Sequence, residues 1–381
     1  MALTINHAYT AMGTDAGNGE VNKARWNAAH SITGYLFTEV TDTPSTDQND
    51  YAPAGFGAST TQIRTNPSVS IIISGLLAGS SGQTVTLVNA STDFFILLVN
   101  ENPSSSAANR FRLPKGFPGA LFPGDYIDFR YDATLARWRV ASWVSQGQAM
   151  GTTEFSDFDF QSPSSSGQAV GVFAGYFSGS GAGYTTTSGT ADYAVNSTEK
   201  PAGLVTMQTG TTTTGRSHLG MNLRSLVWGQ GPMLSVARIA VVAATDGTDT
   251  YTVRSGFVDD PASGSVVNGA GWEYRWNGSA AEWSTITVAA SAVTRATTSM
   301  PTPDLTYIWL ICFVNANGTR VDFFWSQDSV TFTKAPSMST GLPAAGTSTG
   351  FQVASIVKSA GTTTRLVAID LGGKRVDYVR G

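Results

Sequence analysis

Residues 307–325 read YIWLICFVNANGTRVDFFW, and this stretch decides the fold. Two runs of apolar and aromatic residues flank the four residues Asn-Ala-Asn-Gly at 315–318. Such runs favour β-strands, whereas Asn and Gly favour the tight turn of a hairpin. The stretch therefore predicts an antiparallel hairpin whose strands, with Trp309 and Trp325, belong to a hydrophobic core.

The region around this hairpin contains about eight further strand-like segments. They lie at 205–209, 218–223, 233–243, 250–257, 272–276, 283–288, 352–357 and 365–370. With the hairpin they give about ten strands separated by turn residues, which suits a two-sheet jelly roll. Because no fixed-period repeat is present, a solenoid or propeller is not expected. We assign residues 169–381 to this jelly-roll domain.

Residues 35–145 predict a second and smaller β domain. Phe94–Val99 is a continuous apolar run, as expected for a strand buried on both faces. Apolar residues at 127, 129 and 131 alternate with Asp128 and Arg130, as in a half-buried strand. Strand spacings of roughly 8 to 15 residues favour a small sandwich or barrel. Residues 146–168, rich in Gly, Gln and Ser, would form the linker to the jelly roll.

Residues 1–34 differ from the rest and contain the one convincing helix, Glu20–His30. A single helix of this length is marginal in water, so it must pack against a partner surface. We predict a docking segment that contacts another subunit. The candidate docking residues are Val21, Arg25, Trp26 and His30. The alternative, in which these side chains fold back on the first β domain, stays open.

The composition supports an all-β fold and excludes several functions. Only 13% of residues are charged and 41 are glycine, a balance typical of sheets joined by tight turns. The net charge of −4, without a basic cluster, lacks the electrostatic footprint of nucleic-acid binding. No apolar run reaches roughly 18 residues and the N-terminus does not read as a secretory signal, so no membrane insertion is expected. Cys312, the single cysteine, is expected to be a buried, inert thiol.

Two regions of the sequence resemble the N-terminal parts of tailed-bacteriophage virion proteins. GNGEVNKARWNAAHSITG at 17–34 is similar to a segment that precedes the β domains of tail-fibre or head-fibre proteins. The small β domain looks like one that recurs in phage structural proteins. The motifs that carry this second resemblance are GLLAGSSGQTVTLVN at 75–89, ANRFRLP at 108–114 and YDATLARWRV at 131–140.

The C-terminal half resembles phage modules of the concanavalin A-like jelly-roll type. The matching motifs are GRSHLGMNL at 215–223, DTYTVRSGFVDD at 249–260 and SAGTTTRLVAIDLGG at 359–373. The resemblance implies a virion fibre, spike or receptor-binding subunit, assembled in the cytoplasm of the bacterial host. It also implies a homo-oligomer, a trimer in particular, although neither long heptads nor a collagen-like period is present in the sequence.

Groups suited to catalysis are sparse, so no enzymatic activity is expected. His218 follows Ser217, but neighbours in a strand point to opposite faces, so these two do not form a catalytic dyad. A glycan hydrolase on the particle is kept as an alternative, and it would need two converging carboxylates. The candidates for them are Glu273, Glu282, Asp304 and Asp322.

No cofactor or metal is expected from the residue types. A zinc site would need clustered His and Cys, which the sequence lacks. Carboxylates that could bind calcium occur in Gly/Thr-rich turns, where Asp is favoured for hydrogen bonds to its own backbone. These residues are Asp246, Asp249, Asp259 and Asp260. We prefer the turn interpretation.

Four aromatic residues are the candidate ligand-binding residues, because glycans stack on exposed aromatic rings. Trp272, Tyr274 and Trp276 share one face of a strand, and Trp283 would lie across a hairpin. The competing interpretation places this stripe in the core, since aromatic residues at every second position usually face inward. We favour the core, in which case Glu273 would face the solvent.

The sequence thus predicts an attachment subunit of a phage particle. Residues 1–34 would anchor the chain to other virion proteins, and the jelly roll would be displayed for binding to a host-surface protein or glycan. A capsid or tail decoration protein without a receptor is the further alternative.

Overall fold

The computed structural model describes residues 5–6, 31–32, 38–144, 152–156, 192–196, 204–259, 266–301 and 306–376. All regular elements in these ranges are β-strands, apart from the 3-10 helices η1 (Ala107–Asn109) and η2 (Pro114–Gly116). The predicted all-β fold is therefore confirmed. The predicted helix Glu20–His30 and its docking residues lie outside the described residues, between the paired strands β1 (Ile5–Asn6) and β2 (Ser31–Ile32).

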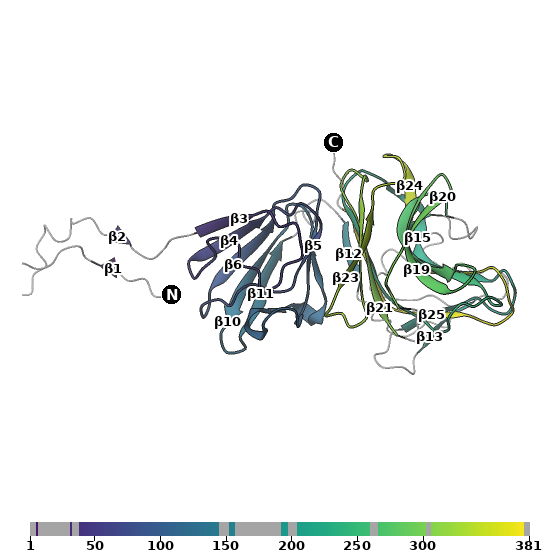
Figure 1. The fold of residues 1–381 in the computed structure, drawn as a ribbon, viewed down its shortest axis with the longest axis horizontal. Coiled ribbons are helices and arrows are strands. Elements are labelled where there is room, and N and C mark those ends of the chain that lie inside the picture. The colour runs from purple at the N-terminus through teal and green to yellow at the C-terminus, as the bar shows by residue number, and fades with distance from the viewer. Residues whose placement is uncertain are drawn as a thin grey trace, which may run out of the picture.

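The small domain consists of two facing sheets, at the left of the two folded bodies in Figure 1. The six-stranded sheet has the order β3 (Thr38–Asp42), β4 (Thr60–Thr65), β6 (Thr84–Asn89), β10 (Tyr126–Asp132), β11 (Arg137–Val144) and β8 (Phe111–Arg112). The three-stranded sheet has the order β5 (Ile71–Ile73), β7 (Ile96–Leu98) and β9 (Gly119–Leu121). Alternating side chains such as Ile63, Leu87 and Phe129 fill the space between the sheets.

The first strands of the small domain run parallel rather than as hairpins. β3, β4 and β6 pair in parallel in one sheet, and β5 and β7 pair in parallel in the other. The chain crosses to the facing sheet between successive strands, so it coils around the core before β10 and β11 close the domain as an antiparallel pair. The predicted sandwich is present, with a path that strand spacing alone does not specify.

The jelly roll consists of an eight-stranded and a six-stranded sheet. The first has the order β13 (Asp192–Asn196), β14 (Leu204–Gln208), β25 (Leu366–Val376), β16 (Met233–Val241), β21 (Ile308–Val314), β22 (Val321–Ser326) and β23 (Thr333–Met338), and β12 (Thr152–Ser156) also pairs with β25. The second has the order β15 (Arg216–Val227), β24 (Ser348–Lys358), β17 (Tyr251–Val258), β18 (Gly269–Trp276), β19 (Ala281–Ala289) and β20 (Ala292–Thr297). Since β12 lies within the predicted linker 146–168, this part of the linker belongs to the jelly-roll sheet.

The hairpin predicted from residues 307–325 forms two adjacent inner strands of the eight-stranded sheet. β21 and β22 pair from Trp309↔Ser326 to Val314↔Val321. The Oδ1 atom of Asn315 accepts hydrogen bonds from the backbone N–H groups of Thr319 and Arg320, at 2.8 and 3.0 Å, which fixes the turn. The predicted antiparallel hairpin is thus confirmed.

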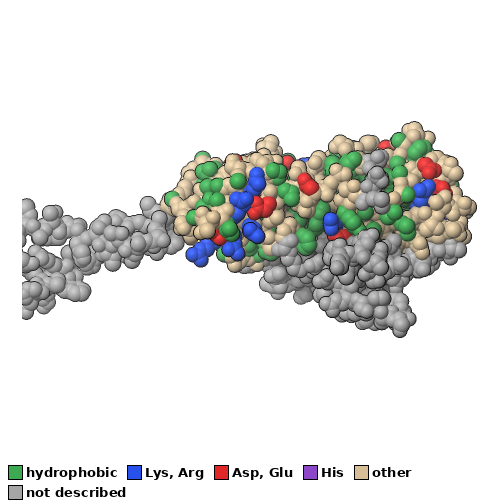
Figure 2. Space-filling model, turned by 90° about the horizontal axis from the view of Figure 1, so that it is seen from below, with side chains coloured by type: hydrophobic (Ala, Val, Ile, Leu, Met, Phe, Trp, Pro, Cys, Tyr) green, Lys and Arg blue, Asp and Glu red, His purple; other side chains and the backbone are tan. Residues whose placement is uncertain are grey.

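A shared hydrophobic interface joins the two domains. Alternate side chains of β5 and β7 leave the small-domain core and pack against alternate side chains of β16 and β21 on the outer face of the eight-stranded sheet. Phe95 stacks on Phe313 with ring centroids 4.5 Å apart. Trp309 belongs to this interface, whereas Trp325 is partly buried against the jelly-roll core. Figure 1 shows the four sheets of the two domains stacked in succession along the long axis, and Figure 2 shows the two folded bodies in direct contact from a perpendicular direction.

Polar contacts also cross the same interface. Arg375 forms a buried ion pair with Asp125, and its guanidinium lies 3.8 Å from the centroid of the Phe122 ring. Lys334 donates from Nζ to the carbonyl oxygen of Ser70 at 2.7 Å. The described residues contain no helix with the length and apolar character needed to cross a membrane.

Candidate ligand-binding face of the jelly roll

The aromatic stripe fills the core of the jelly roll. Trp272, Tyr274 and Trp283 are at most 1% exposed and belong to the main hydrophobic cluster. Their polar atoms point inward as well: Trp272 donates from Nε1 to the Ile311 carbonyl oxygen at 3.1 Å. These three rings lie between the two sheets, as the core interpretation predicted, so a ligand on the outer surface cannot stack on them and they are not ligand-binding residues. Trp276, at the end of β18, is partly exposed.

The side chains between these aromatics lie on the opposite, outer face of the six-stranded sheet. Direct pairing places one residue from each strand in a row: His218, Ser355, Arg254, Glu273, Ser284 and Thr297. We call this set the outer polar row. It crosses all six strands, so residues far apart in sequence meet on one surface.

Glu273 is the centre of the outer polar row, and three arginines surround it. Arg254 donates from Nε to Oε2 at 2.8 Å, and Arg295 donates from Nε to Oε1 at 2.7 Å. The Nε atom of Arg275 lies 3.5 Å from Oε1, and its Nη2 donates to Glu282 at 3.1 Å. The side chain of Glu273 is fully buried, so the expectation that it faces solvent is wrong.

The charge of Glu273 is stabilised by this arrangement. Burial alone would raise the pKa of the Glu273 carboxyl, but the charges and hydrogen bonds of Arg254 and Arg295 outweigh burial and lower it. The carboxylate therefore stays ionised at neutral pH. It aligns the three guanidinium groups, which are 14–33% exposed at their side chains.

Among the described residues, three side-chain polar atoms of this face are buried and make no hydrogen bond. They are Nε of Arg275, Oγ of Ser284, which is paired directly with Glu273, and Oε1 of Gln352 on β24. Ser284 and Gln352 are 1% exposed, and buried polar groups in proteins are almost always paired. A ligand that supplied donors at these positions would satisfy the two oxygen atoms.

Two glycines lie between Gln352 and the edge strand β20 on the outer face of the sheet. Gln352 pairs with Gly256, which pairs with Gly271, and the next residues across are Ile286 and Arg295. A Cβ atom on Gly271 would lie 2.4 Å from the Ser255 carbonyl oxygen, so the close approach of the two strands requires glycine there. As a result, this part of the face has a floor of bare backbone.

His218 lies at one end of the outer polar row. Burial, with the nearby charge of Arg216, lowers the pKa of His218 to about 4, so its imidazole is neutral at pH 7. His218 pairs with Ser355 on the outer face, whereas Ser217 pairs with Ile356 of the core. The prediction that these two neighbours point to opposite faces is confirmed.

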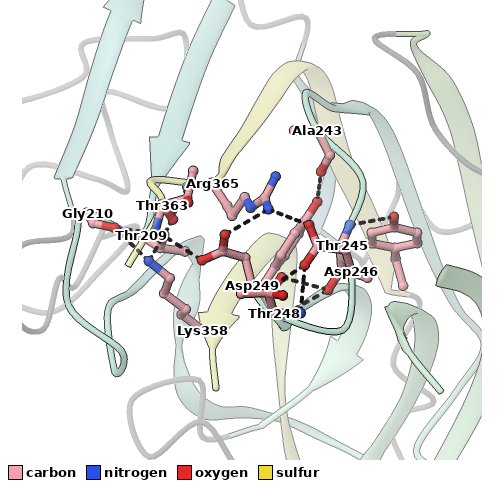
Figure 3. A network of polar contacts seen from close by, with 12 residues as sticks. Thr209, Gly210, Ala243, Thr245, Asp246, Thr248, Asp249, Lys358, Thr363 and Arg365 are labelled. Atoms are coloured by element: carbon pink, nitrogen blue, oxygen red, sulfur yellow. Dashed lines mark hydrogen bonds and ion pairs between the residues drawn. The ribbon is translucent and has the colours of Figure 1, made fainter. Parts of the chain in front are cut away.

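Two of the carboxylates considered for calcium, Asp246 and Asp249, form a structural network in the jelly roll (Figure 3). Asp246 accepts hydrogen bonds from the backbone N–H groups of Thr248 and Asp249, at 2.8 and 2.7 Å, as the turn interpretation predicted. Asp249 accepts from the backbone N–H of Thr363, and Arg365 lies within 3.3 Å of both carboxylates. The network ties the β16–β17 loop to the end of β24 and the start of β25.

The remaining acidic candidates are also accounted for by structural contacts. Asp259 accepts two backbone hydrogen bonds at 2.7 Å, and Asp322 pairs with Arg320 and with Ser70 of the small domain. Asp260 and Asp304 lie outside the described residues. Among the described residues, no group of three or more His, Cys, Asp or Glu could hold a metal ion.

Comparison with known proteins shows a similarity of fold only. The chain matches no protein-family model and no curated protein. A Shewanella oneidensis protein of unknown function is 15% identical, with a TM-score of 0.44 over 63% of this chain and 98% of that one. The endo-β-1,4-glucuronan lyase of Trichoderma reesei is 10% identical, with a TM-score of 0.36 over 52% and 92%. Peanut lectin is 11% identical, with a TM-score of 0.35 over 52% and 98%.

The outer face of the six-stranded sheet contains residues that the sequence analysis did not single out. Arg254, Arg295, Ser284 and Gln352 occupy ordinary polar positions in alternating strands. Their outward direction could have been predicted from the alternation, but the pairing that brings them together on one face is set by strand register. The candidate face is therefore a property of the folded sheet.

Proposed function

We propose that this chain is a non-enzymatic attachment subunit of a bacteriophage particle and that the outer face of its six-stranded sheet binds a host-surface glycan. One observation carries the glycan-binding part: Ser284 and Gln352 have buried polar atoms on the same face as the Glu273 cluster, and these atoms make no hydrogen bond within the described part of the chain. Sugar hydroxyls are the kind of donor and acceptor that would satisfy such atoms.

The state of Glu273 supports binding rather than hydrolysis. A general acid for glycosidic cleavage needs a raised pKa, so that it is protonated near neutral pH. The arginines around Glu273 lower its pKa and hold the group ionised. This carboxylate is better suited to positioning guanidinium groups than to giving up a proton.

The domain interface supports a role in display. The two β domains share a buried hydrophobic cluster and the Asp125–Arg375 ion pair, so we expect them to move as one unit. A rigid unit of this kind can hold a binding face at a fixed distance from an anchoring segment. The virion location, anchoring through residues 1–34 and assembly as a homotrimer rest on the sequence resemblance.

Binding of the purified chain to an array of bacterial surface glycans tests the glycan-binding part. We expect binding that weakens in Gln352→Leu and stays unchanged in the matched control Gln62→Leu, on the six-stranded sheet of the small domain. Absence of binding to every glycan would contradict the proposal and favour a decoration protein. Release of reducing ends from a bound polysaccharide would favour the hydrolase instead.

Deletion of residues 1–34 tests the anchor. Particles assembled with the truncated chain should lack it, as judged by mass spectrometry of purified virions. Incorporation at the level of the full chain would show that the anchor lies elsewhere.

A further inference from the structure

The charge of the outer face indicates which glycans it would take. Its described residues include four arginines and two glutamates, so the face is positive although the chain carries a net charge of −4. The arginines are Arg216, Arg254, Arg275 and Arg295, and the glutamates are Glu273 and Glu282. A positive face on an acidic protein would concentrate anionic ligands at this surface.

Arg295 is positioned to bind an anion. Its Nε donates to buried Glu273, which fixes the plane of the guanidinium, and its side chain is 33% exposed. The two terminal nitrogens of Arg295 make no hydrogen bond within the described part of the chain. A guanidinium held in this way offers two parallel N–H donors, the geometry that matches the two oxygens of a carboxylate.

Uncharged groups on the same face would hold the rest of the ligand. Gln352 and Arg295 are at opposite ends of a row that crosses Gly256, Gly271 and Ile286. Four strand spacings separate them, roughly 19 Å. This length accommodates several sugar units. The unpartnered Oε1 of Gln352 can accept from a sugar hydroxyl, while the arginine end binds the acidic group.

We infer that the ligand of this face is an acidic saccharide, with a sugar carboxylate bound by Arg295 beside Arg275 and sugar hydroxyls bound by Gln352 and Ser284. This inference rests on the proposed glycan-binding function and narrows it to one chemical class. Nucleic acid is the other common polyanion, but its binding requires a dense cluster of basic residues, which this sequence lacks.

The test compares probes that differ in one chemical group. The full chain is titrated with glucuronate oligosaccharides, with the same oligosaccharides after reduction of their carboxyl groups, with dextran sulfate and with single-stranded DNA. We expect the carboxylated form to bind at least about tenfold more tightly than its reduced form, with affinity falling as salt rises. Dextran sulfate and DNA should bind more weakly than the carboxylated form.

Variants locate the acidic group on the face. Arg295→Gln should weaken binding of the carboxylated oligosaccharide about tenfold. Arg295→Lys, which keeps the charge but loses the two parallel N–H donors, should have an intermediate affinity. Arg139→Gln, an exposed arginine of the small domain, is the matched control and should leave affinity unchanged. Equal melting temperatures of the variants would show that folding is intact.

The outcomes separate this inference from the proposed function. Equal binding of the carboxylated and reduced oligosaccharides, or an unchanged affinity in Arg295→Gln, would overturn the acidic-ligand inference while leaving glycan binding in place. Tighter binding of DNA or dextran sulfate would overturn it as well. Absence of binding to any probe here and to every glycan of the array would remove the proposed function itself.

Discussion

At the scale of single residues, the sequence alternation predicted the direction of the Glu273 side chain correctly but did not predict its burial. Its position between Trp272 and Tyr274 puts it on the outer face, as the alternation predicts. It is nevertheless fully buried, because Arg254, Arg275 and Arg295 come from neighbouring positions on three strands to surround it. Sequence gives the direction of a side chain but not its cross-strand neighbours.

Glu273→Gln is predicted to destabilise the protein in a pH-dependent way. The pKa of Glu273 is lowered by folding, so its contribution is present above the unfolded value near 4.5 and is lost as pH falls through the folded pKa. At pH 7 we expect the free energy of unfolding to fall by about 2 kcal/mol, measured by chemical denaturation. The loss should become smaller as the pH falls below about 4.5. A pH-independent loss would contradict the ionic role, and Glu282→Gln, at the rim, should cost less.

His218 is predicted to titrate far below an ordinary histidine. Folding lowers its pKa to about 4, so between about pH 6.5 and pH 4 the unfolded chain binds more protons than the folded one. The free energy of unfolding should therefore decrease as the pH is lowered from about 6.5 to about 4, and His218→Gln should make this decrease smaller. NMR titration of the imidazole measures the pKa directly. A value near 6.5 would show that the side chain is more hydrated than the structure indicates.

At the scale of elements, the local signals were the reliable ones. The β21–β22 hairpin was predictable because its turn residues and its two strands are adjacent in sequence. The parallel pairing of β3, β4 and β6 was not, because each pair is separated by a passage through the facing sheet. Strand spacing indicates how many strands there are but not which ones meet.

The hairpin turn gives a prediction at this scale. Gly318 has a φ of +66°, and a Cβ there would lie 2.4 Å from Nε1 of Trp228, which donates to the Gly318 carbonyl oxygen. Gly318→Ala should lower the free energy of unfolding by about 3 kcal/mol. Gly278→Ala is the matched control, since φ is +105° but no atom lies within 4 Å, and it should cost about 1 kcal/mol. Equal losses in urea unfolding would contradict the steric argument.

At the scale of the whole molecule, the domain interface explains two features of the sequence. The runs at Phe94–Val99 and Tyr307–Val314 are apolar at every position because one set of side chains faces a domain core and the alternate set faces the other domain. Burial on both faces of the first run was predicted from its composition. The partner was not, because nothing local in either run specifies what covers its second face.

The buried ion pair at the interface gives the prediction at this scale. Arg375 and Asp125 are 2% and 0% exposed at their side chains, so Arg375→Leu removes the partner of a buried carboxylate. The free energy of unfolding should fall by about 3 kcal/mol, and the single unfolding transition should separate into one for each domain. In the matched control, the exposed Arg139–Asp132 pair, Arg139→Leu should change stability by less than about 0.5 kcal/mol. A comparable loss in both variants would show that the interface pair has no special role.

A structure of the chain bound to a glucuronate oligosaccharide tests the central claim most directly. We predict sugar density over the outer face of β15–β24–β17–β18–β19–β20, with a carboxylate on Arg295 and a hydroxyl on Gln352. An oligosaccharide bound in the loops around Asp246 and Asp249, or on the small domain, would contradict the assignment of this face.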